Sequence, residues 1–276
     1  EQITVSIPGC IMYSPFQLGV RYLKYYVSAS NGSGHGMHSP FVFDFIINVL
    51  KDDRHFYAYQ SIENLRQLLL INRSQLTIED FGAGSRVKKI NTRSVGDIAR
   101  SSLKPPKFGK LLFRMVNRYA PNTILELGSS LGITTAYLAS ARAGATIITM
   151  EGARSVAAMA KRNFNKLGLT NIELVEGNFD ETLPPVVTRL HSIDLVFIDG
   201  NHRLEPTVRY FRQLLPAVHE YSILVFDDIH WSKEMEQAWK IIKEDPAVTL
   251  SIDLFFIGLV FFRKEHKVKQ HFTIRF

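Results

Sequence analysis

From residue 121 onward, short apolar runs alternate along the chain with stretches in which apolar residues recur at helical spacing. Alternation of this kind predicts an α/β fold with a mainly parallel sheet and helices on both of its faces. The expected strands are residues 123–126, 145–150, 171–175, 193–198 and 222–226. Two further runs, 248–253 and 256–263, are joined by a very short link and predict an antiparallel hairpin at the sheet edge. The pattern therefore predicts seven strands.

The chain before residue 121 shows helix-like apolar spacing and no convincing series of strands. The expected helices are residues 13–30, 40–50, 61–71 and 107–119. A glycine-rich stretch, residues 31–36, separates the first two, and Pro105 and Pro106 mark a break before the last. We therefore predict a helical N-terminal extension over residues 1–105 and a second domain over residues 106–276. The extension is suited to be a lid, a dimer contact or a partner site, and the pattern does not choose among these.

The composition is that of an ordinary globular protein. Of 276 residues, 46% are hydrophobic and 21% are charged, which excludes an intrinsically disordered chain. Cys10 is the one cysteine, so no internal disulfide can form, and a reducing, cytoplasmic compartment is expected. No run of about 18 uncharged apolar residues occurs, which argues against a membrane span. Residues 1–12 lack the basic start and the long apolar stretch of a signal peptide.

Positive charge is concentrated in one segment of the chain. The formal net charge is +7, from 33 basic and 26 acidic residues. Residues 86–118 contain ten Lys or Arg residues and a single acid, Asp97, so this segment alone carries +9. Such a segment either forms a solvated helix face or binds an acidic substrate, a phosphate or nucleic acid. The solvated face is favoured because no aromatic-and-basic binding module accompanies the cluster.

A glycine-rich turn follows the first expected strand and opens a helix. Residues 125–132 read LeuGluLeuGlySerSerLeuGly and contain Glu126, Gly128, Ser129, Ser130 and Gly132. Glycine at such a turn lets the backbone approach a ligand closely, and the helix N-terminus favours anionic groups of that ligand. Glu126 stands where a nicotinamide-dinucleotide site would place its first glycine. An acid there repels pyrophosphate, but it can hold an ammonium group or accept hydrogen bonds.

Further polar residues end the next two strands. Glu151 and Gly152 follow the second strand, and Glu151 lies 23 residues after Gly128, where an acid is placed to bind ribose hydroxyls. Asn178, Phe179 and Asp180 follow the third strand. The glycine-rich turn, the acid and the later polar run therefore stand in the order that a nucleoside-containing ligand requires.

This ordered set resembles the class I S-adenosylmethionine-dependent methyltransferases, over about half of the chain (residues 121–263). The resemblance implies a Rossmann-like seven-stranded sheet whose last strand is antiparallel, with S-adenosylmethionine as cofactor. The implied cofactor-binding residues are Glu126, Gly128, Ser129, Ser130, Gly132, Glu151, Gly152, Asn178, Phe179, Asp180 and Asp199. A second run similar to the first motif, residues 79–84, has no acid about 20 residues further on and is interpreted as a turn.

Acids also end the fourth and fifth strands. Asp199 follows the fourth strand, and Asp227 and Asp228 follow the fifth. Neighbouring strands place these carboxylates in one crevice, where they repel one another unless a cation or a proton intervenes. Oxygen ligands favour Mg²⁺ or Ca²⁺, so the three aspartates predict a divalent-metal site. Two alternatives stay open: Asp227 and Asp228 cap the following helix, or Asp199 simply closes the cofactor pocket.

The spacing of these acids resembles that of the metal-dependent O-methyltransferases of the catechol, caffeoyl-coenzyme A and sugar-modifying types. That resemblance implies methyl transfer to a hydroxyl of a small molecule, assisted by a divalent cation. His202 falls where the catechol type has a lysine, so the catalytic candidates are His202, His230 and Asp199, with either histidine as the base. A loop that contains His35 and His38 could close over the site.

Two other functions stay open from the sequence. One is an RNA or protein methyltransferase anchored by the basic segment 86–118, although no motif of the Asn-Pro-Pro-Tyr type follows the fourth strand. The other is a non-catalytic protein that binds the cofactor and interacts through its helical extension. As partners we expect a small-molecule methyl acceptor and a homodimer formed through the extension. Nucleic acid is not favoured, and no membrane contact is expected.

Overall fold

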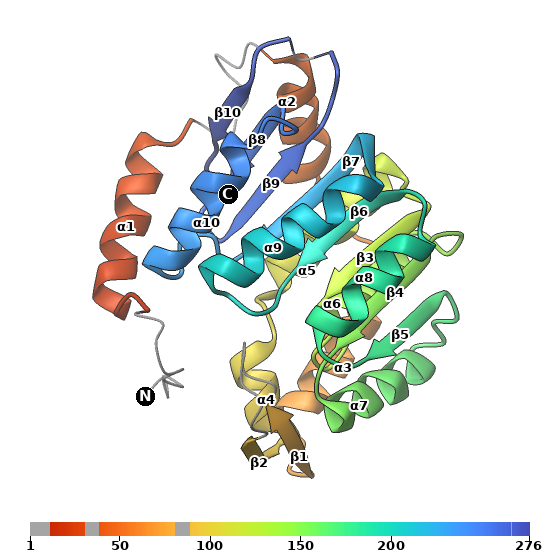
Figure 1. Ribbon diagram of the computed structural model, residues 1–276. Coiled ribbons are helices and arrows are strands. Elements are labelled where there is room, and N and C mark those ends of the chain that lie inside the picture. The colour runs from red at the N-terminus through yellow and green to blue at the C-terminus, as the bar shows by residue number, and fades with distance from the viewer. Residues whose placement is uncertain (1–11, 31–38, 81–88, 266) are drawn as a thin grey trace.

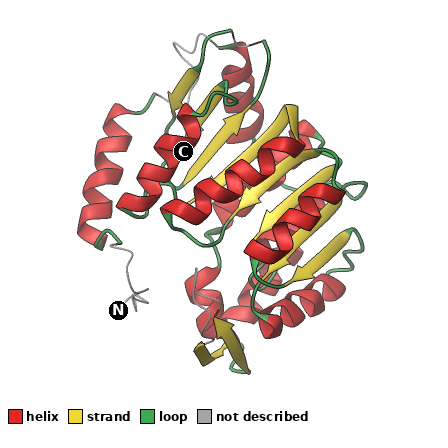
Figure 2. Cartoon of the chain, viewed as in Figure 1, coloured by secondary structure: helices red, strands yellow, loops and turns green. Residues whose placement is uncertain are grey.

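The computed structural model describes residues 12–30, 39–80, 89–265 and 267–276. An eight-stranded sheet lies at its centre, with helices on both faces (Figures 1 and 2). Its strands are β3 (Thr123–Leu127), β4 (Thr146–Glu151), β5 (Ile172–Glu176), β6 (Ile193–Ile198), β7 (Val218–Asp227), β8 (Leu250–Asp253), β9 (Ile257–Phe261) and β10 (Gln270–Thr273). Across the sheet they are ordered β10-β8-β9-β7-β6-β3-β4-β5.

The pairing confirms the α/β class and the seven expected strands. Strands β5, β4, β3, β6 and β7 are all parallel, and β9 is antiparallel to β7. The expected hairpin, β8 and β9, is present, but it does not form the edge of the sheet, because β10 adds in parallel to β8. The sequence did not predict β10, since its four residues (Gln-His-Phe-Thr) are too short and too polar to form an apolar run.

Helices lie on both faces of the sheet (Figure 1). They are α5 (Pro106–Tyr119), α6 (Ile133–Ala141), α7 (Arg154–Lys166), α8 (Phe179–Arg189), α9 (Leu204–Leu214), continued by a 3₁₀ turn (Leu215–Ala217), and α10 (Lys233–Glu244). Ser232 caps α10 by accepting a hydrogen bond from the Met235 amide at 3.1 Å. Strands such as β6, covered on both faces, are almost continuously apolar, and this made them recognisable in the sequence.

The N-terminal part is mainly helical, as predicted. Its elements are α1 (Pro15–Ser28), α2 (Pro40–Phe45), continued by a π-helical turn (Ile46–Leu50), α3 (Tyr57–Leu70), β1 (Gln75–Asp80), β2 (Lys89–Ser94) and α4 (Val95–Ser102). The expectation of no strands here is wrong, because β1 and β2 form a separate antiparallel hairpin near α4 (Figure 1). Both strands are rich in polar residues and lack the apolar run of a buried strand, and among the described strands they pair with each other alone. Of the run 79–84, residues 79 and 80 end β1, and the rest lies outside the described residues.

The N-terminal helices share hydrophobic cores with the sheet. Val42 and Phe45 of α2 belong to one buried cluster with Leu259 of β9, and Leu65 of α3 packs in another with Ala136 of α6. The division at residues 105 and 106 stays a prediction, since the packing is continuous across it. None of the helices in the described ranges is long and apolar enough to cross a membrane.

Candidate active site

The glycine-rich turn joins β3 to α6 and lies against the end of β6. Gly128 has a φ of 104°, and a Cβ at this position would collide with the carbonyl oxygen of Asp199. Gly132 has a φ of 82°, and a Cβ there would collide with the ring of Phe164. Backbone conformation and close packing therefore both require glycine at these two positions. Ser130, between them, also adopts a positive φ, of 47°.

Glu151 fastens the glycine-rich turn to the end of β4. Its Oε2 accepts a hydrogen bond from the Ser130 amide at 2.9 Å, and its Oε1 accepts one from the Ala153 amide at 2.9 Å. Burial raises the pKa of Glu151, and these backbone hydrogen bonds partly oppose that effect. Ser129 lies beside the same strand, with its hydroxyl 2.5 Å from that of Thr149. The turn and the ends of β3 and β4 thus form one hydrogen-bonded unit.

Glu126 lies beneath this unit and is completely buried. Its Oε2 accepts hydrogen bonds from the hydroxyls of Thr135 and Thr149, whereas the buried Oε1 has no partner among the described residues. Burial raises the pKa of Glu126 to about 7. The expectation that this acid accepts hydrogen bonds agrees with the geometry, and its contact with a cofactor stays a prediction.

Asn178, Phe179 and Asp180 begin α8 beyond β5. The Asn178 side chain caps the helix by accepting a hydrogen bond from the Asp180 amide at 3.1 Å. Asp180 accepts a hydrogen bond from the Tyr210 hydroxyl at 2.7 Å and pairs with Arg209 at 2.8 Å. Burial opposes ionisation of Asp180, but Arg209 and Tyr210 outweigh it and lower its pKa. Asp180 is thus engaged by α9, whereas the Phe179 ring lies against the backbone of Gly200, beyond the end of β6.

The predicted acids of β6 and β7 meet at the carboxyl ends of these strands. One ligand atom from each of Asp199, His202 and Asp227 lies within 4.8 Å of the others. The His202 Nε2 is 3.4 Å from Asp199 Oδ1, and the His202 side chain is 30% exposed. Asp228 adopts a positive φ of 54°, a sparsely populated conformation that is common at functional sites. The structure therefore brings Asp199, Asp227, Asp228 and His202 together.

A residue that the sequence did not single out completes this cluster. Lys104 lies between α4 and α5, and its Nζ forms an ion pair with Asp227 and a second one, of 2.9 Å, with Asp228 Oδ2. In the sequence Lys104 was one of ten basic residues in the segment 86–118. Its local pattern gives no sign that it faces two acids more than 120 residues away. The two prolines that follow it mark only a break in the chain.

The cluster is strongly coupled electrostatically. Burial raises the pKa of Asp227 well above its usual range, and the charges of Asp199 and Asp228 add to this. Burial also opposes ionisation of Asp199, but Lys104 and His202 outweigh it and hold its pKa at about 2. For Lys104, burial lowers the pKa, whereas the three carboxylates raise it by more. The ionised form is therefore favoured for Asp199 and the ammonium form for Lys104, whereas ionisation of Asp227 is opposed by its burial and its acidic neighbours.

The predicted divalent-metal site can be tested against this arrangement. The oxygen ligands of Asp199, Asp227 and Asp228 are of the kind that Mg²⁺ and Ca²⁺ prefer. The Lys104 ammonium, however, contacts the carboxylates of Asp227 and Asp228, so that a cation on those oxygens would have to displace it. The donor types fit a metal and the arrangement as folded does not, so metal binding stays a prediction.

His230 occupies a different environment from His202. Its Nε2 is 2.8 Å from Asp253 Oδ2, its Nδ1 is 3.2 Å from Glu236 Oε1, and its ring stacks on Phe255. Burial lowers the pKa of His230, but the two carboxylates outweigh it and raise the pKa overall. A protonated imidazole between two acids is a poor proton acceptor, so this pairing disfavours the predicted role of His230 as base. His35 and His38 lie outside the described residues.

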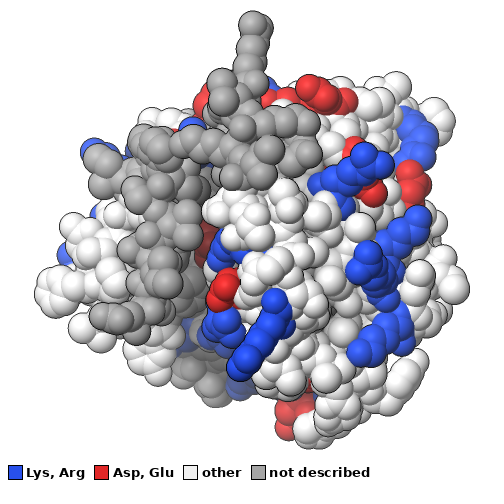
Figure 3. All heavy atoms as spheres, turned by 90° about the horizontal axis from the view of Figure 1, so that it is seen from below, with Lys and Arg blue, Asp and Glu red and all other residues white. Residues whose placement is uncertain are grey.

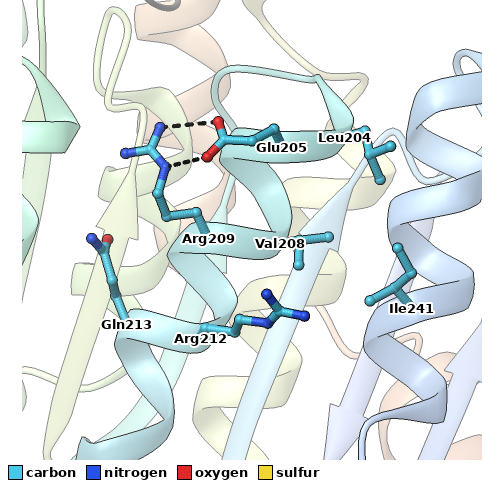
Figure 4. A pocket seen from close by; sticks show the side chains of 7 residues that line it. All are labelled: Leu204, Glu205, Val208, Arg209, Arg212, Gln213 and Ile241. Carbon is cyan, nitrogen blue, oxygen red and sulfur yellow. Dashed lines mark hydrogen bonds and ion pairs between the residues drawn. The ribbon is translucent and has the colours of Figure 1, made fainter.

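A groove of about 560 Å³ lies between α9 and α10 (Figure 4). It is lined by Leu204, Glu205, Val208, Arg209, Arg212, Gln213 and Ile241. Arg209 is held by Glu205 on one side and by Asp180 on the other. The groove contains none of the residues predicted for the site.

Much of the basic segment is engaged within the molecule. Arg100 pairs with Asp97, Arg118 pairs with Asp44, and Lys104 pairs with the two acids at the end of β7. Lys110 lies over the ring of Tyr59. On the face shown in Figure 3, Lys and Arg side chains lie among both uncharged and acidic residues. This distribution agrees with a solvated surface better than with a single anionic-ligand patch.

A known protein family matches the part of the chain that contains the candidate site. Residues 125–229 match the model of a family described as "Methyltransferase domain". A "Transmembrane O-methyltransferase homolog" of Mus musculus is 30% identical over 124 residues, which is 43% of this chain and 46% of that protein. A "Transmembrane O-methyltransferase" of Macaca mulatta is 33% identical over 98 residues, covering 34% of this chain and 33% of that protein. The chain thus spans less than half the length of these relatives.

Solved structures with the same fold extend the match over most of the chain. The S-adenosylhomocysteine-bound methyltransferase PaMTH1 of Podospora anserina superposes with a TM-score of 0.58 at 15% identity, covering 82% of this chain and 97% of that one. An O-methyltransferase of Bacillus cereus, in complex with S-adenosylhomocysteine, gives a TM-score of 0.55 at 16% identity, covering 78% and 95%. At this level of identity the likeness concerns the fold.

Proposed function

We propose that this chain is a class I S-adenosylmethionine-dependent methyltransferase that transfers a methyl group to a hydroxyl of a small molecule. The matching family model, the fold and the ordered motifs all indicate a methyltransferase domain. The choice of a hydroxyl acceptor is supported by the O-methyltransferase relatives and by the cluster of acids and His202 at the ends of β6 and β7. The observation that carries the proposal is the convergence of the glycine-rich turn and this cluster: the Asp199 backbone packs directly against Gly128.

The residues around the turn fit S-adenosylmethionine. Glu151 lies at the end of β4, where an acid is placed for ribose hydroxyls, and its orientation is fixed by backbone amides on both oxygens. The ring of Phe179 lies beside the backbone at the end of β6 and offers a face for the adenine. The Oε1 of Glu126, which has no partner in the described part of the chain, is a buried acceptor beneath the turn. These residues would hold the nucleoside, and the turn would position the methionine part.

When bound, S-adenosylmethionine supplies a methyl group whose bond to sulfur breaks with both electrons left on sulfur while the acceptor oxygen bonds to the carbon. The chain must align the acceptor oxygen with this methyl group and remove the hydroxyl proton. His202 is the residue we assign to take that proton, because it lies in the cluster and is partly exposed. Asp199, ionised and 3.4 Å from the Nε2 of His202, stabilises the imidazolium that forms.

The acceptor is proposed to be a small molecule because the described residues of the basic segment are mostly engaged within the chain, in ion pairs and ring contacts. Metal assistance, expected from the spacing of the acids, remains to be tested, and we derive no step from it because Lys104 contacts the same carboxylates. A homodimer and a cytoplasmic location likewise stay predictions.

Calorimetric titration with S-adenosylhomocysteine tests the cofactor part of the proposal. We expect one site per chain, and we expect Glu151→Gln to weaken binding about tenfold or more, because a neutral amide cannot accept as strongly from ribose hydroxyls. The matched control is Glu176→Gln. Glu176 ends the neighbouring strand directly opposite Glu151, so this substitution should leave the affinity unchanged.

Methyl transfer itself is tested with labelled S-adenosylmethionine and a panel of hydroxylated acceptors. A product that carries the label on oxygen supports the proposal, and His202→Gln should then reduce kcat by about 100-fold or more. A folded protein that binds no S-adenosylhomocysteine would contradict the proposed function. Binding without transfer to any acceptor of the panel would favour the non-catalytic alternative.

A further inference from the structure

Lys104 reaches the carboxylate cluster from outside the part of the chain that matches the family model, residues 125–229. It follows α4, in the segment that runs from Ser102, the last residue of α4, to Pro105, the residue before α5. Two residues earlier, the Ser102 hydroxyl lies 2.7 Å from the hydroxyl of Ser130 in the glycine-rich turn. The segment therefore touches both halves of the candidate site, the turn through Ser102 and the acids through Lys104.

A chain of side-chain contacts, which starts at the largely buried Arg66, holds the backbone of Lys104. Arg66 of α3, whose side chain is 7% exposed, donates a hydrogen bond to the Lys104 carbonyl oxygen at 2.8 Å. Arg66 also pairs with Glu63 at 2.9 Å. Glu63 in turn accepts a hydrogen bond from the Tyr137 hydroxyl of α6 at 2.7 Å. The position of Lys104 is therefore fixed by contacts with α3 and, through α3, with α6. A lysine on a solvated face has no such contacts.

We propose that Lys104 is the resident cation of this site: its ammonium takes the place between Asp227 and Asp228 that a divalent metal would otherwise take, and it presents a donor to the acceptor oxygen. The second half of this proposal rests on the proposed function. The first half concerns the folded chain alone and can be tested without knowing the acceptor.

The chemistry of the ammonium group supports both halves. An ammonium group has three N–H donors, and among the described residues Lys104 forms two ion pairs, with Asp227 and Asp228. One donor therefore remains for the acceptor oxygen. Donors aimed at an oxygen that gains negative charge stabilise the transition state in a site that excludes water. Mg²⁺, in contrast, needs oxygen ligands at about 2.0–2.1 Å in octahedral geometry. The Asp228 oxygen that would serve it already lies 2.9 Å from the Lys104 Nζ.

The experiment is a titration of Mn²⁺ into the full chain with S-adenosylhomocysteine present, followed by electron paramagnetic resonance of the free ion. The variants are Lys104→Met, Lys104→Arg and, as matched control, Lys107→Met. Lys107 is exposed, stands three residues away and lies over the ring of Phe108, and its substitution removes the same charge. We expect no one-to-one Mn²⁺ site in the wild type, in Lys104→Arg or in the control. Lys104→Met should bind Mn²⁺ at least about tenfold more tightly than the wild type, and Asp228→Asn in that background should abolish the gain.

The wild-type titration keeps the proposal falsifiable even if Lys104→Met does not fold. A one-to-one Mn²⁺ site in the wild type that Asp228→Asn removes would overturn the proposal, as would Mn²⁺ affinities that are equal in folded wild type and Lys104→Met. If S-adenosylhomocysteine does not bind to the wild type, the proposed function fails, whereas the metal titration still decides the first half. If S-adenosylhomocysteine binds and the wild type also takes up Mn²⁺ at Asp228, only the role of Lys104 fails.

Discussion

The two parts of the chain that meet at the candidate site place their residues in different ways. In the sheet, Glu151, Asp199 and Asp227 each end or directly follow a strand, and the parallel pairing of β4, β3, β6 and β7 brings those ends to one edge. In the N-terminal part, Lys104 reaches the same edge from a loop, held by Arg66 and thus by α3. The difference teaches that strand ends are positioned by backbone pairing, whereas Lys104 is positioned by buried side chains.

The largest loss of stability is expected at the position in the sheet part where the backbone leaves no room for a side chain. Gly128→Ala should cost about 3 to 4 kcal/mol of unfolding free energy and abolish S-adenosylhomocysteine binding, because its φ is 104° and its Cβ would collide with the Asp199 carbonyl. Denaturant unfolding and calorimetry measure the two effects. The control is Gly144→Ala, since a Cβ at Gly144 meets nothing within 4 Å. Equal stability of the two variants would show that the turn is not constrained as described.

A somewhat smaller loss of stability is expected when the contacts of Arg66 in the N-terminal part are removed. Arg66→Leu should cost about 3 kcal/mol, because it leaves Glu63 without its ion pair and the Lys104 carbonyl without its donor. It should also admit Mn²⁺ to Asp227 and Asp228, since Lys104 is no longer held. The control is Arg154→Leu, whose side chain is 88% exposed and lies 3.9 Å from Glu176. If the variant loses stability but still excludes Mn²⁺, Arg66 stabilises the fold without positioning Lys104.

The next effect depends on pH. His230→Gln should lower the unfolding free energy by about 2 kcal/mol near pH 5.5, because it removes a charged partner from Asp253 and Glu236. The folded-state pKa of His230 is raised above the unfolded value of about 6.5, so its stabilisation is complete below that pH and is lost as the pH rises through the folded-state pKa. The difference between wild type and variant should therefore shrink from pH 5.5 to 8.5. A difference that grows with pH would show that His230 is neutral in the folded protein.

The smallest effect is expected where α1 packs on the sheet part. Tyr25→Phe should cost about 1 kcal/mol, because the buried Tyr25 hydroxyl donates to the Ile274 carbonyl oxygen. Tyr26→Phe is the control, because Tyr26 lies one position further along the helix and is 49% exposed. S-adenosylhomocysteine affinity should be unchanged in both. Equal thermal unfolding of the two variants would mean that this hydrogen bond does not stabilise the helix.

Much of the sheet and of its site followed from local pattern. Buried strands such as β6 are almost continuously apolar, so the seven main strands could be located, and the residues at their ends could be chosen as candidates. Strand β10 and the hairpin of β1 and β2 were missed, because short polar strands differ little from loops until a neighbour pairs with them. The hairpin of β8 and β9 was found, but its neighbour β10 was not.

By itself the sequence determined the α/β fold, the glycine-rich turn, the acid at the end of β4 and the acids at the ends of β6 and β7. These depend on residues close together in the chain, or on backbone pairing that every parallel sheet shares. Only the tertiary structure decided that Lys104 joins Asp227 and Asp228, that His230 is held between Asp253 and Glu236, and that His202 stays beside Asp199. Such pairings depend on how separate helices and loops pack, and the pattern of apolar and polar residues specifies which face is buried but not which charge it meets.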